Sequence, residues 1–175
     1  MILQNFDITL RQMCEKDLEM VLLWRNSEHI RQYALTQETI TLQEHKAWFD
    51  SLAKKGDLYF IIESDEKPVG LIWANRFQEK SCETGMYIYE TKLQNSLFAY
   101  KVSLTLNEYL FQVRKLEAIE CEILNENKRS IRYTLSLGYE ESHKEKEVTY
   151  FKLTKERFEP NFEKISKRLK KSTLR

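Results

Sequence analysis

A strand–helix–strand pattern in the middle of the chain limits the folds that it can adopt. Glu83–Tyr89 has the composition of a strand, and apolar residues then recur at three- and four-residue intervals from Phe98 to Val113, which predicts a long amphipathic helix. The short apolar run Ala118–Leu124 predicts a buried strand after that helix. A helix of this length between two strands of one sheet makes a crossover connection, so a mixed sheet is expected.

The segments before the crossover predict an antiparallel meander. Residues 6–10 alternate apolar and polar side chains, which indicates a half-buried first strand. Leu58–Ile62 and Val69–Ala74 are two apolar runs joined by a short polar turn, and they predict a hairpin. Glu83–Tyr89 would extend this hairpin by a third strand.

Helices are predicted from capping signals and from periodicity. Residues 15–25 have helical spacing, and the capping box Thr41–Glu44 begins a second helix that runs to about Lys55. Asn127 can cap a further helix that ends at Gly138, where a glycine accommodates the left-handed terminal conformation.

Two closing strands complete the pattern, one from Tyr139 onward and one over Val148–Leu153. The order of elements predicts an α/β fold, a single domain with a mixed, mostly antiparallel sheet and helices on both faces. We assign this domain to residues 1–158 and expect a basic C-terminal helix or tail over 159–175.

Charge and composition exclude several classes of partner. Lys and Arg number 28 and Asp and Glu 27, so the net charge of +1 carries no signature of nucleic-acid binding. No apolar run approaches the ~20 residues of a membrane helix, and the N-terminus does not resemble a signal peptide, so we expect a cytoplasmic protein without a membrane partner. Cys14, Cys82 and Cys121 are widely separated and lack metal-ligand spacing, so no metal is expected.

Two clusters of charged and aromatic residues lie on the first two predicted helices. One consists of Trp24–Asn26 with Arg31 nearby, and the other of Glu44–His45 with Trp48. Together with the order of elements, these clusters resemble the GCN5-related N-acetyltransferase (GNAT) family, in the branch of ribosomal-protein alanine and nucleotide-sugar 4-amino (pseudaminic-acid type) N-acetyltransferases. The resemblance implies the acceptor-binding residues Arg25, Asn26, Arg31 and Trp48. Salt bridges and a helix C-cap are an equal alternative for the two arginines and the asparagine.

The resemblance also implies acetyl-CoA as the acetyl donor, without a metal. The family's pyrophosphate loop reads Arg or Gln, two residues, Gly, one residue, then Gly or Ala; here Gln94 and Ala99 keep its ends and Leu97 replaces its middle glycine. A glycine lets backbone N–H groups approach phosphate closely, so Leu97 predicts weakened donor binding. The implied donor-binding residues are Met86, Tyr87, Gln94, Asn95, Ser96, Leu97, Phe98, Ala99, Asn127, Lys128 and Arg129.

Acetyl transfer needs a base, because an amine is mostly protonated near neutral pH. We assign this role to Glu83, with His45 as the alternative base and a solvated strand carboxylate as the alternative interpretation of Glu83. Many relatives carry a tyrosine seven residues after the capping asparagine as an acid for the departing thiolate. Here Thr134 holds that position, and the candidate acid Tyr133 precedes it by about 100° around the helix.

The expected function is acetyl transfer from acetyl-CoA to a primary amine of a small molecule, with an amino sugar on a nucleotide carrier as the favoured acceptor. A protein N-terminus is the second acceptor. A non-catalytic GNAT-fold binding module with a degraded pyrophosphate loop is the alternative from another class. We also consider a homodimer.

Overall fold

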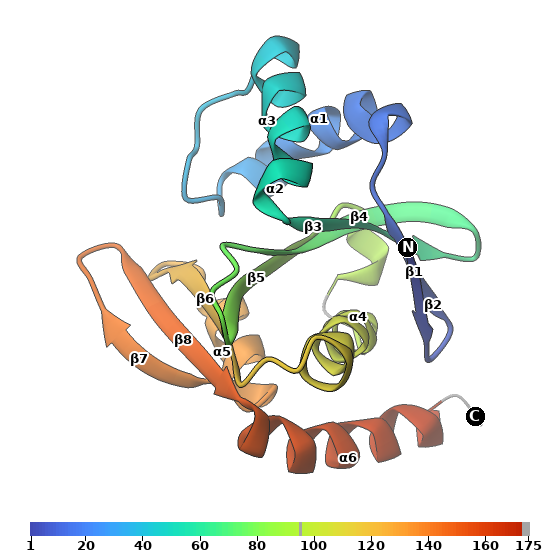
Figure 1. The fold of residues 1–175 in the computed structure, drawn as a ribbon, viewed down its shortest axis with the longest axis vertical. Helices are drawn as coiled ribbons and strands as arrows, with labels where there is room; N and C mark the ends of the chain where they lie inside the picture. The colour runs from blue at the N-terminus through green and yellow to red at the C-terminus, as the bar shows by residue number, and fades with distance from the viewer. Residues whose placement is uncertain (95, 173–175) are drawn as a thin grey trace.

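An eight-stranded sheet forms the centre of the computed structural model, which describes residues 1–94 and 96–172 (Figure 1). The strands are β1 Ile2–Asn5, β2 Ile8–Gln12, β3 Leu58–Ser64, β4 Lys67–Asn75, β5 Ser81–Ile88, β6 Ala118–Leu124, β7 Glu140–Lys144 and β8 Val148–Thr154. The α-helices in these residues are α1 Leu18–Asn26, α2 Glu28–Arg31, α3 Leu42–Lys55, α4 Phe98–Glu108, α5 Lys128–Ser136 and α6 Lys155–Ser172.

The sheet is mixed and mostly antiparallel. Its strands lie in the order β1-β2-β3-β4-β5-β6-β8-β7, and β5 with β6 is the parallel pair, connected by α4. Helices α1, α2 and α3 lie on one side of the sheet and α4, α5 and α6 on the other (Figure 1). The predicted fold class is therefore confirmed.

The first predicted strand is a hairpin rather than a single strand. Phe6 and Asp7 have positive φ values of 57° and 128°, and they form the turn between β1 and β2. The Asn5 side chain accepts a hydrogen bond from the Phe6 N–H at 2.9 Å, and the Asp7 carboxylate binds Lys101 of α4 at 2.7 Å. The turn thus depends on a contact with a distant helix, whereas the alternation of residues 6–10 indicated one continuous strand.

Each face of the sheet carries its own hydrophobic cluster. On the α4–α6 face, Phe111 and Phe151 are fully buried, and Phe158, Ile165 and Leu169 anchor α6. On the opposite face, buried side chains of α1 pack on β3 and β4, and partly buried rings of α3 join them. Since α6 begins at Lys155 and contributes to the larger cluster, the C-terminal segment is packed on the domain as far as Leu169.

The two parallel strands separate after a short contact. Pairing between β5 and β6 covers Ser81–Glu83 against Ala118–Glu120, and in the described residues it does not continue beyond Glu83. Strand β5 runs on to Ile88, and β6 runs on to Leu124 with β8 as its other neighbour. This divergence opens the sheet beside the start of α4.

Within residues 1–94 and 96–172, no helix has the length and apolar character that crossing a membrane requires. The same residues contain no group of three or more His, Cys, Asp or Glu side chains placed to hold a metal ion.

Candidate active site

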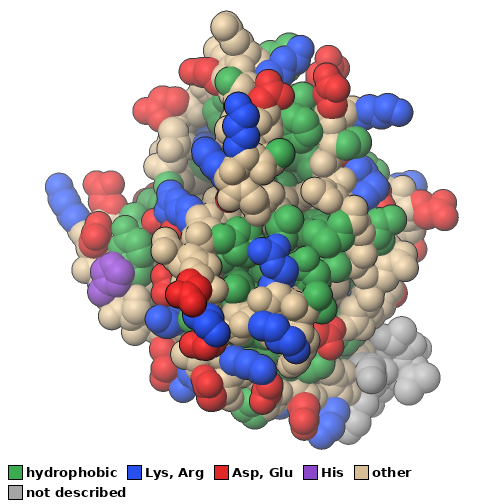
Figure 2. Space-filling model, viewed as in Figure 1, with side chains coloured by type: hydrophobic (Ala, Val, Ile, Leu, Met, Phe, Trp, Pro, Cys, Tyr) green, Lys and Arg blue, Asp and Glu red, His purple; other side chains and the backbone are tan. Residues whose placement is uncertain are grey.

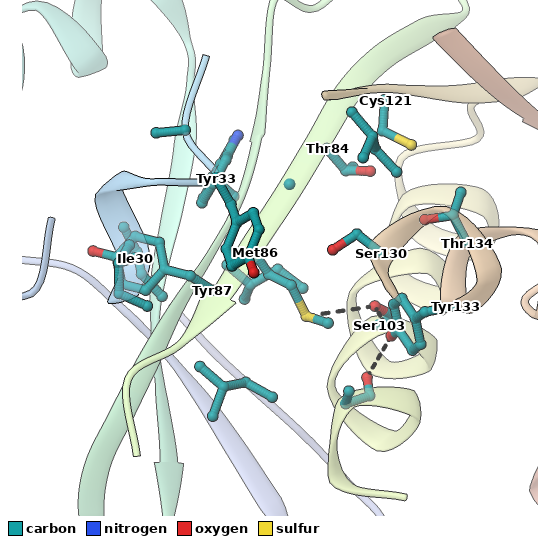
Figure 3. Close-up of a pocket in the computed structure, with 18 of the residues that line it drawn as sticks. Ile30, Tyr33, Thr84, Met86, Tyr87, Ser103, Cys121, Ser130, Tyr133 and Thr134 are labelled. Carbon is teal, nitrogen blue, oxygen red and sulfur yellow. Dashed lines mark hydrogen bonds between the residues drawn. The ribbon is translucent and has the colours of Figure 1, made fainter. Parts of the chain in front are cut away.

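A cavity of about 1020 Å³ occupies the opening between β5 and β6. Its lining comes from both sides of the sheet: α4 and α5 on one side, and α1, α3 and the segment after α2 on the other (Figure 3). We call these the α4–α5 side and the α1–α3 side. Seen from the direction of Figure 1, the surface shows apolar side chains in the middle of the molecule with Lys and Arg side chains among and around them (Figure 2).

The start of α4 forms one end of the α4–α5 side. The Ser96 hydroxyl accepts a hydrogen bond from the Phe98 N–H at 3.2 Å, and Leu97 occupies the N-cap position with 45% of its surface exposed. The Gln94 amide donates to the Ile88 carbonyl at 2.8 Å and accepts from Arg129 at 3.3 Å, which ties the loop to β5 and α5. The first N–H groups of a helix have no intrahelical partners, so this end suits a phosphate group.

The predicted donor-binding residues fall largely in this region. Met86 of β5 accepts a hydrogen bond from the Ser103 hydroxyl at 3.7 Å, and buried Asn127 caps α5 by accepting from the Ser130 N–H at 3.1 Å. Lys128 and the buried Phe98 are not among the residues that line the cavity. Asn95 lies outside the described residues.

Tyr133 binds α4 with its hydroxyl. The Tyr133 oxygen lies 2.8 Å from the Ala99 carbonyl and 2.7 Å from the Ser103 hydroxyl, and Figure 3 shows the ring directed at α4. Burial raises the pKa of Tyr133, so the phenol stays protonated near neutral pH. Thr134 lies near Cys121 in the same view, on another face of α5. The two neighbours thus point to different places, and the Tyr133 hydroxyl joins α5 to α4.

Glu83 lies where β5 and β6 begin to separate. Its carboxylate accepts a hydrogen bond from Arg76 Nη1 at 2.8 Å, and the same nitrogen lies 3.0 Å from Glu122 on β6. All three side chains line the cavity. No sequence signal marked Arg76 or Glu122, because the former follows a strand and the latter lies within one; only the sheet brings them together.

Gly85 makes room for an aromatic ring. A Cβ atom placed on Gly85 would lie 2.3 Å from Cζ2 of Trp73, its cross-strand partner. The Trp73 ring stacks on Tyr59 with ring centroids 6.0 Å apart, and Tyr59 in turn makes a T-shaped contact with Trp48 at 4.8 Å. These rings form a wall of the α1–α3 side, of which the sequence motifs indicated only Trp48.

Arg25 and Tyr87 bring polar atoms into the α1–α3 side. One guanidinium nitrogen of Arg25 donates to the Thr36 carbonyl, whereas Nη1 is buried and makes no hydrogen bond with the described residues. The Tyr87 hydroxyl is likewise buried without such a bond. Burial lowers the pKa of Arg25 and raises that of Tyr87. Both residues line the cavity, and each has a hydrogen-bond donor without a partner among the described residues.

Asn26 and Arg31 hold the segment that follows α2. The Asn26 amide donates to the Ile40 carbonyl at 2.8 Å and accepts from the Ile40 N–H at 2.9 Å, and Arg31 donates to the Gln37 carbonyl at 3.0 Å. Neither side chain lines the cavity. Their observed contacts shape the cavity wall, and their direct contact with an acceptor stays a prediction.

His45 lines the cavity and is only 4% exposed. Its ring stacks on Trp48 at 4.8 Å, and its Nε2 is buried without a hydrogen-bond partner among the described residues. Burial lowers the pKa of His45, an effect that a hydrogen bond with the Leu18 backbone partly opposes. The imidazole is therefore neutral near pH 7, as a base must be.

Comparison with known proteins assigns the family. Residues 7–140 match the family model of the acetyltransferase (GNAT) domain, so the chain belongs to the GNAT family. Acetyltransferase PseH of Campylobacter jejuni is 23% identical over 143 residues, which cover 81% of this chain and 82% of PseH. The predicted family and enzyme class are thereby confirmed: the protein is an acetyl-CoA-dependent N-acetyltransferase.

Two proteins illustrate the similarity of this fold to solved structures. The first is apo FdhC, a nucleotide-linked sugar GNAT, with a TM-score of 0.81 and 22% identity over 95% of this chain and 97% of that chain. The second is the aminoglycoside acetyltransferase AAC(6')-Ib in complex with ribostamycin and coenzyme A, with a TM-score of 0.78 and 21% identity over 87% of this chain and 96% of that chain.

The residues present fit acetyl-CoA. The strands separate for several residues beside Met86, and the first turn of α4 ends the same cavity, so an extended thioester and its phosphates both find suitable surroundings. Bound acetyl-CoA supplies the activated acetyl group. The exposed Leu97 side chain lies at the N-cap of α4. It does not disrupt the first turn of α4, whose N–H groups keep their helical positions.

Proposed function

We propose that the protein acetylates the primary amine of an amino sugar carried by a nucleotide. The charge of the cavity carries this proposal. Its lining contains Arg25 on the α1–α3 side, Arg76 where the sheet opens, and Arg129 and Arg132 on α5, whereas its acidic side chains are Glu83 and Glu122, both bound to Arg76. A cavity of this composition favours an anionic acceptor with a single amine over a polycationic aminoglycoside.

The acceptor would occupy the α1–α3 side. The unpartnered donors of Arg25 and Tyr87 suit phosphate oxygens, because a buried guanidinium and a phenol both form strong hydrogen bonds with anions. The rings of Trp48, Tyr59 and Trp73 suit the apolar face of a sugar or base. FdhC, which shares the fold, is a nucleotide-linked sugar GNAT, and this supports the proposal.

Acetyl transfer would take place between the α4–α5 side and the α1–α3 side of the cavity. Glu83 takes the proton of the acceptor amine, directly or through water, and the strand backbone near Met86 polarises the thioester carbonyl. His45 is the alternative base, since it is neutral and lines the same side. The departing thiolate needs little help from an acid, because a thiol of pKa ~8.5 costs only about 2 kcal/mol to leave as its anion near pH 7.

The proposal includes a cytoplasmic location. Cys14, Cys82 and Cys121 are all unpaired thiols, which is usual for proteins of reducing compartments.

Calorimetry tests the acceptor class without turnover. The protein is saturated with coenzyme A and titrated with UDP and, separately, with kanamycin. We expect UDP to bind, to bind more weakly as salt is raised, and to lose at least tenfold in affinity in Arg25→Ala. Kanamycin binding in the absence of UDP binding would contradict the proposal.

A further inference from the structure

Arg76 lies at the point where β5 and β6 separate. It follows Asn75, the residue of β4 that pairs with Glu83, and Glu83 is the last residue of β5 that pairs with β6. Arg76 Nη1 contacts Glu83 at 2.8 Å and Glu122 at 3.0 Å, so one nitrogen bridges the two separating strands.

The backbone at Arg76 is held in an uncommon conformation. Its φ is 49°, in the left-handed region, which is unfavourable for a residue with a side chain. The Arg76 N–H donates to the Asp57 carboxylate at 3.2 Å, which supports that conformation. A strained residue that persists at a cavity is a reason to look for a function of its side chain.

Arg76, Glu83 and Glu122 form a charged cluster, and its net charge matches one acceptor amine. Two carboxylates and one guanidinium leave a net charge of −1, and Glu83 and Glu122 are the acidic side chains of the described cavity lining. An acceptor ammonium would therefore find its counter-charge here, at the end of the cavity where a base is needed. The hydrogen bond with Glu83 raises the pKa of Arg76, so the guanidinium stays charged at all working pH values.

We propose that Arg76 is a positioning residue of the acetyl transfer, which holds the Glu83 and Glu122 carboxylates ready for the acceptor ammonium. The inference rests on the proposed role of Glu83. Glu83 takes one proton from the ammonium, and the nitrogen lone pair then attacks the thioester carbon. The carbon–sulfur bond breaks, the thiolate takes the second proton released by nitrogen, and Glu83 returns the first to solvent.

Other ionisable groups lie near the cluster on β5 and on neighbouring strands. Cys82, Cys121 and Tyr150 lie within the electrostatic range of Glu83, and burial raises the pKa of each, so they are neutral near pH 7. Asp57 and Tyr59 lie near Arg76. Glu120, the residue of β6 in register with Glu83, is paired with Lys152 at 3.3 Å. Arg76 and Glu122 are therefore the main charged groups around Glu83.

A double-mutant cycle tests the coupling. Arg76→Met, Glu83→Gln and the double variant are compared with the wild type by the rate of thiol release from acetyl-CoA. We expect Glu83→Gln to lower kcat by ~10²- to 10⁴-fold and Arg76→Met by about 10- to 100-fold. If Arg76 acts through Glu83, the double variant is no slower than Glu83→Gln alone.

Two further readouts distinguish positioning from a merely structural role. Arg76→Lys should recover most of the loss, because an ammonium can also lie between two carboxylates. The Arg76→Met deficit should be largest at low pH, because two adjacent carboxylates without a shared cation retain a proton. Lys80→Met, which breaks the exposed pair between Lys80 and Glu117, is the control and should stay within about twofold of the wild-type rate.

The outcomes separate this inference from the proposed function. The cycle is run with a UDP-linked 4-amino sugar and with kanamycin. Additive losses, or a Glu83→Gln rate equal to that of the wild type, would overturn the role of Arg76 whichever amine is used. Coupling between Arg76 and Glu83 that is seen only with kanamycin would support the role of Arg76 and overturn the proposed acceptor class. If neither amine is acetylated, both the role of Arg76 and the proposed function are overturned.

Discussion

Gly85→Ala tests whether the aromatic wall is a fixed part of the site. The new methyl group would lie 2.3 Å from Cζ2 and 2.7 Å from Cε2 of Trp73, so the indole must retreat by roughly 1 Å to reach ordinary contact. Overpacking of this kind costs about 1–3 kcal/mol, and each kcal/mol lowers the melting temperature of a domain of this length by about 2–4 °C. A displacement of that size beside the acceptor should lower kcat/KM for the acceptor by about 10- to 100-fold.

The assay combines thermal unfolding with steady-state kinetics in both substrates. Gly56→Ala is the matched control, because Gly56 has a φ of 71° but a Cβ there meets nothing within 4 Å. The control should lose about 1–2 kcal/mol of stability from its left-handed backbone and keep its kinetic constants. Wild-type kinetics in Gly85→Ala, with unchanged acetyl-CoA affinity, would refute the assignment of Trp73 to the acceptor wall.

Two other substitutions test the donor loop and the buried imidazole. Leu97→Gly should tighten acetyl-CoA binding a few-fold in calorimetry, because a glycine at the α4 N-cap lets phosphate approach the first turn; weaker binding would contradict the role of this loop. His45 has a lowered pKa in the folded state, so the unfolded state binds more protons and the wild type should lose stability as pH falls below ~6.5, by at most about 1.4 kcal/mol per pH unit. Denaturant unfolding of His45→Gln should show a shallower loss between pH 7 and pH 5, and an identical slope would refute the argument.

Local signals in the sequence were sufficient for much of the fold. The capping box of α3 is present as predicted: the Glu44 N–H donates to the Thr41 hydroxyl at 3.3 Å, and the Thr41 N–H donates to the Glu44 carboxylate at 2.7 Å. Gly138, with a φ of 102°, follows the end of α5 as expected. Such signals work because the groups that satisfy a helix end are neighbours in the chain.

The parts that escaped prediction depend on contacts between distant residues. The turn at Phe6 and Asp7 is secured by Lys101, and no local pattern distinguished it from a continuous strand. Position 85 is a glycine because the ring of Trp73, on the neighbouring strand β4, requires the space. In both cases the partner lies on another element, so only the assembled sheet reveals the reason for the residue.

The residues of the candidate site also divide into those that short motifs indicated correctly and those whose position depends on the assembled fold. Short motifs indicated Arg25, His45 and Glu83, and all three line the cavity. Asn26 and Arg31 belong to the same motifs but bind backbone of the segment after α2. A motif records which residues occur together in a family, and it does not record whether each one faces the ligand or supports the wall around it.

A direct comparison of acceptors tests the central claim. Purified protein with saturating acetyl-CoA is given a UDP-linked 4-amino sugar, kanamycin or a peptide with a free N-terminal alanine, and kcat/KM is measured for each by thiol release and by the mass of the product. The cationic cavity lining predicts that kcat/KM for the nucleotide-linked sugar exceeds that for either alternative by at least 100-fold. Equal or higher kcat/KM for kanamycin or for the peptide would contradict the account.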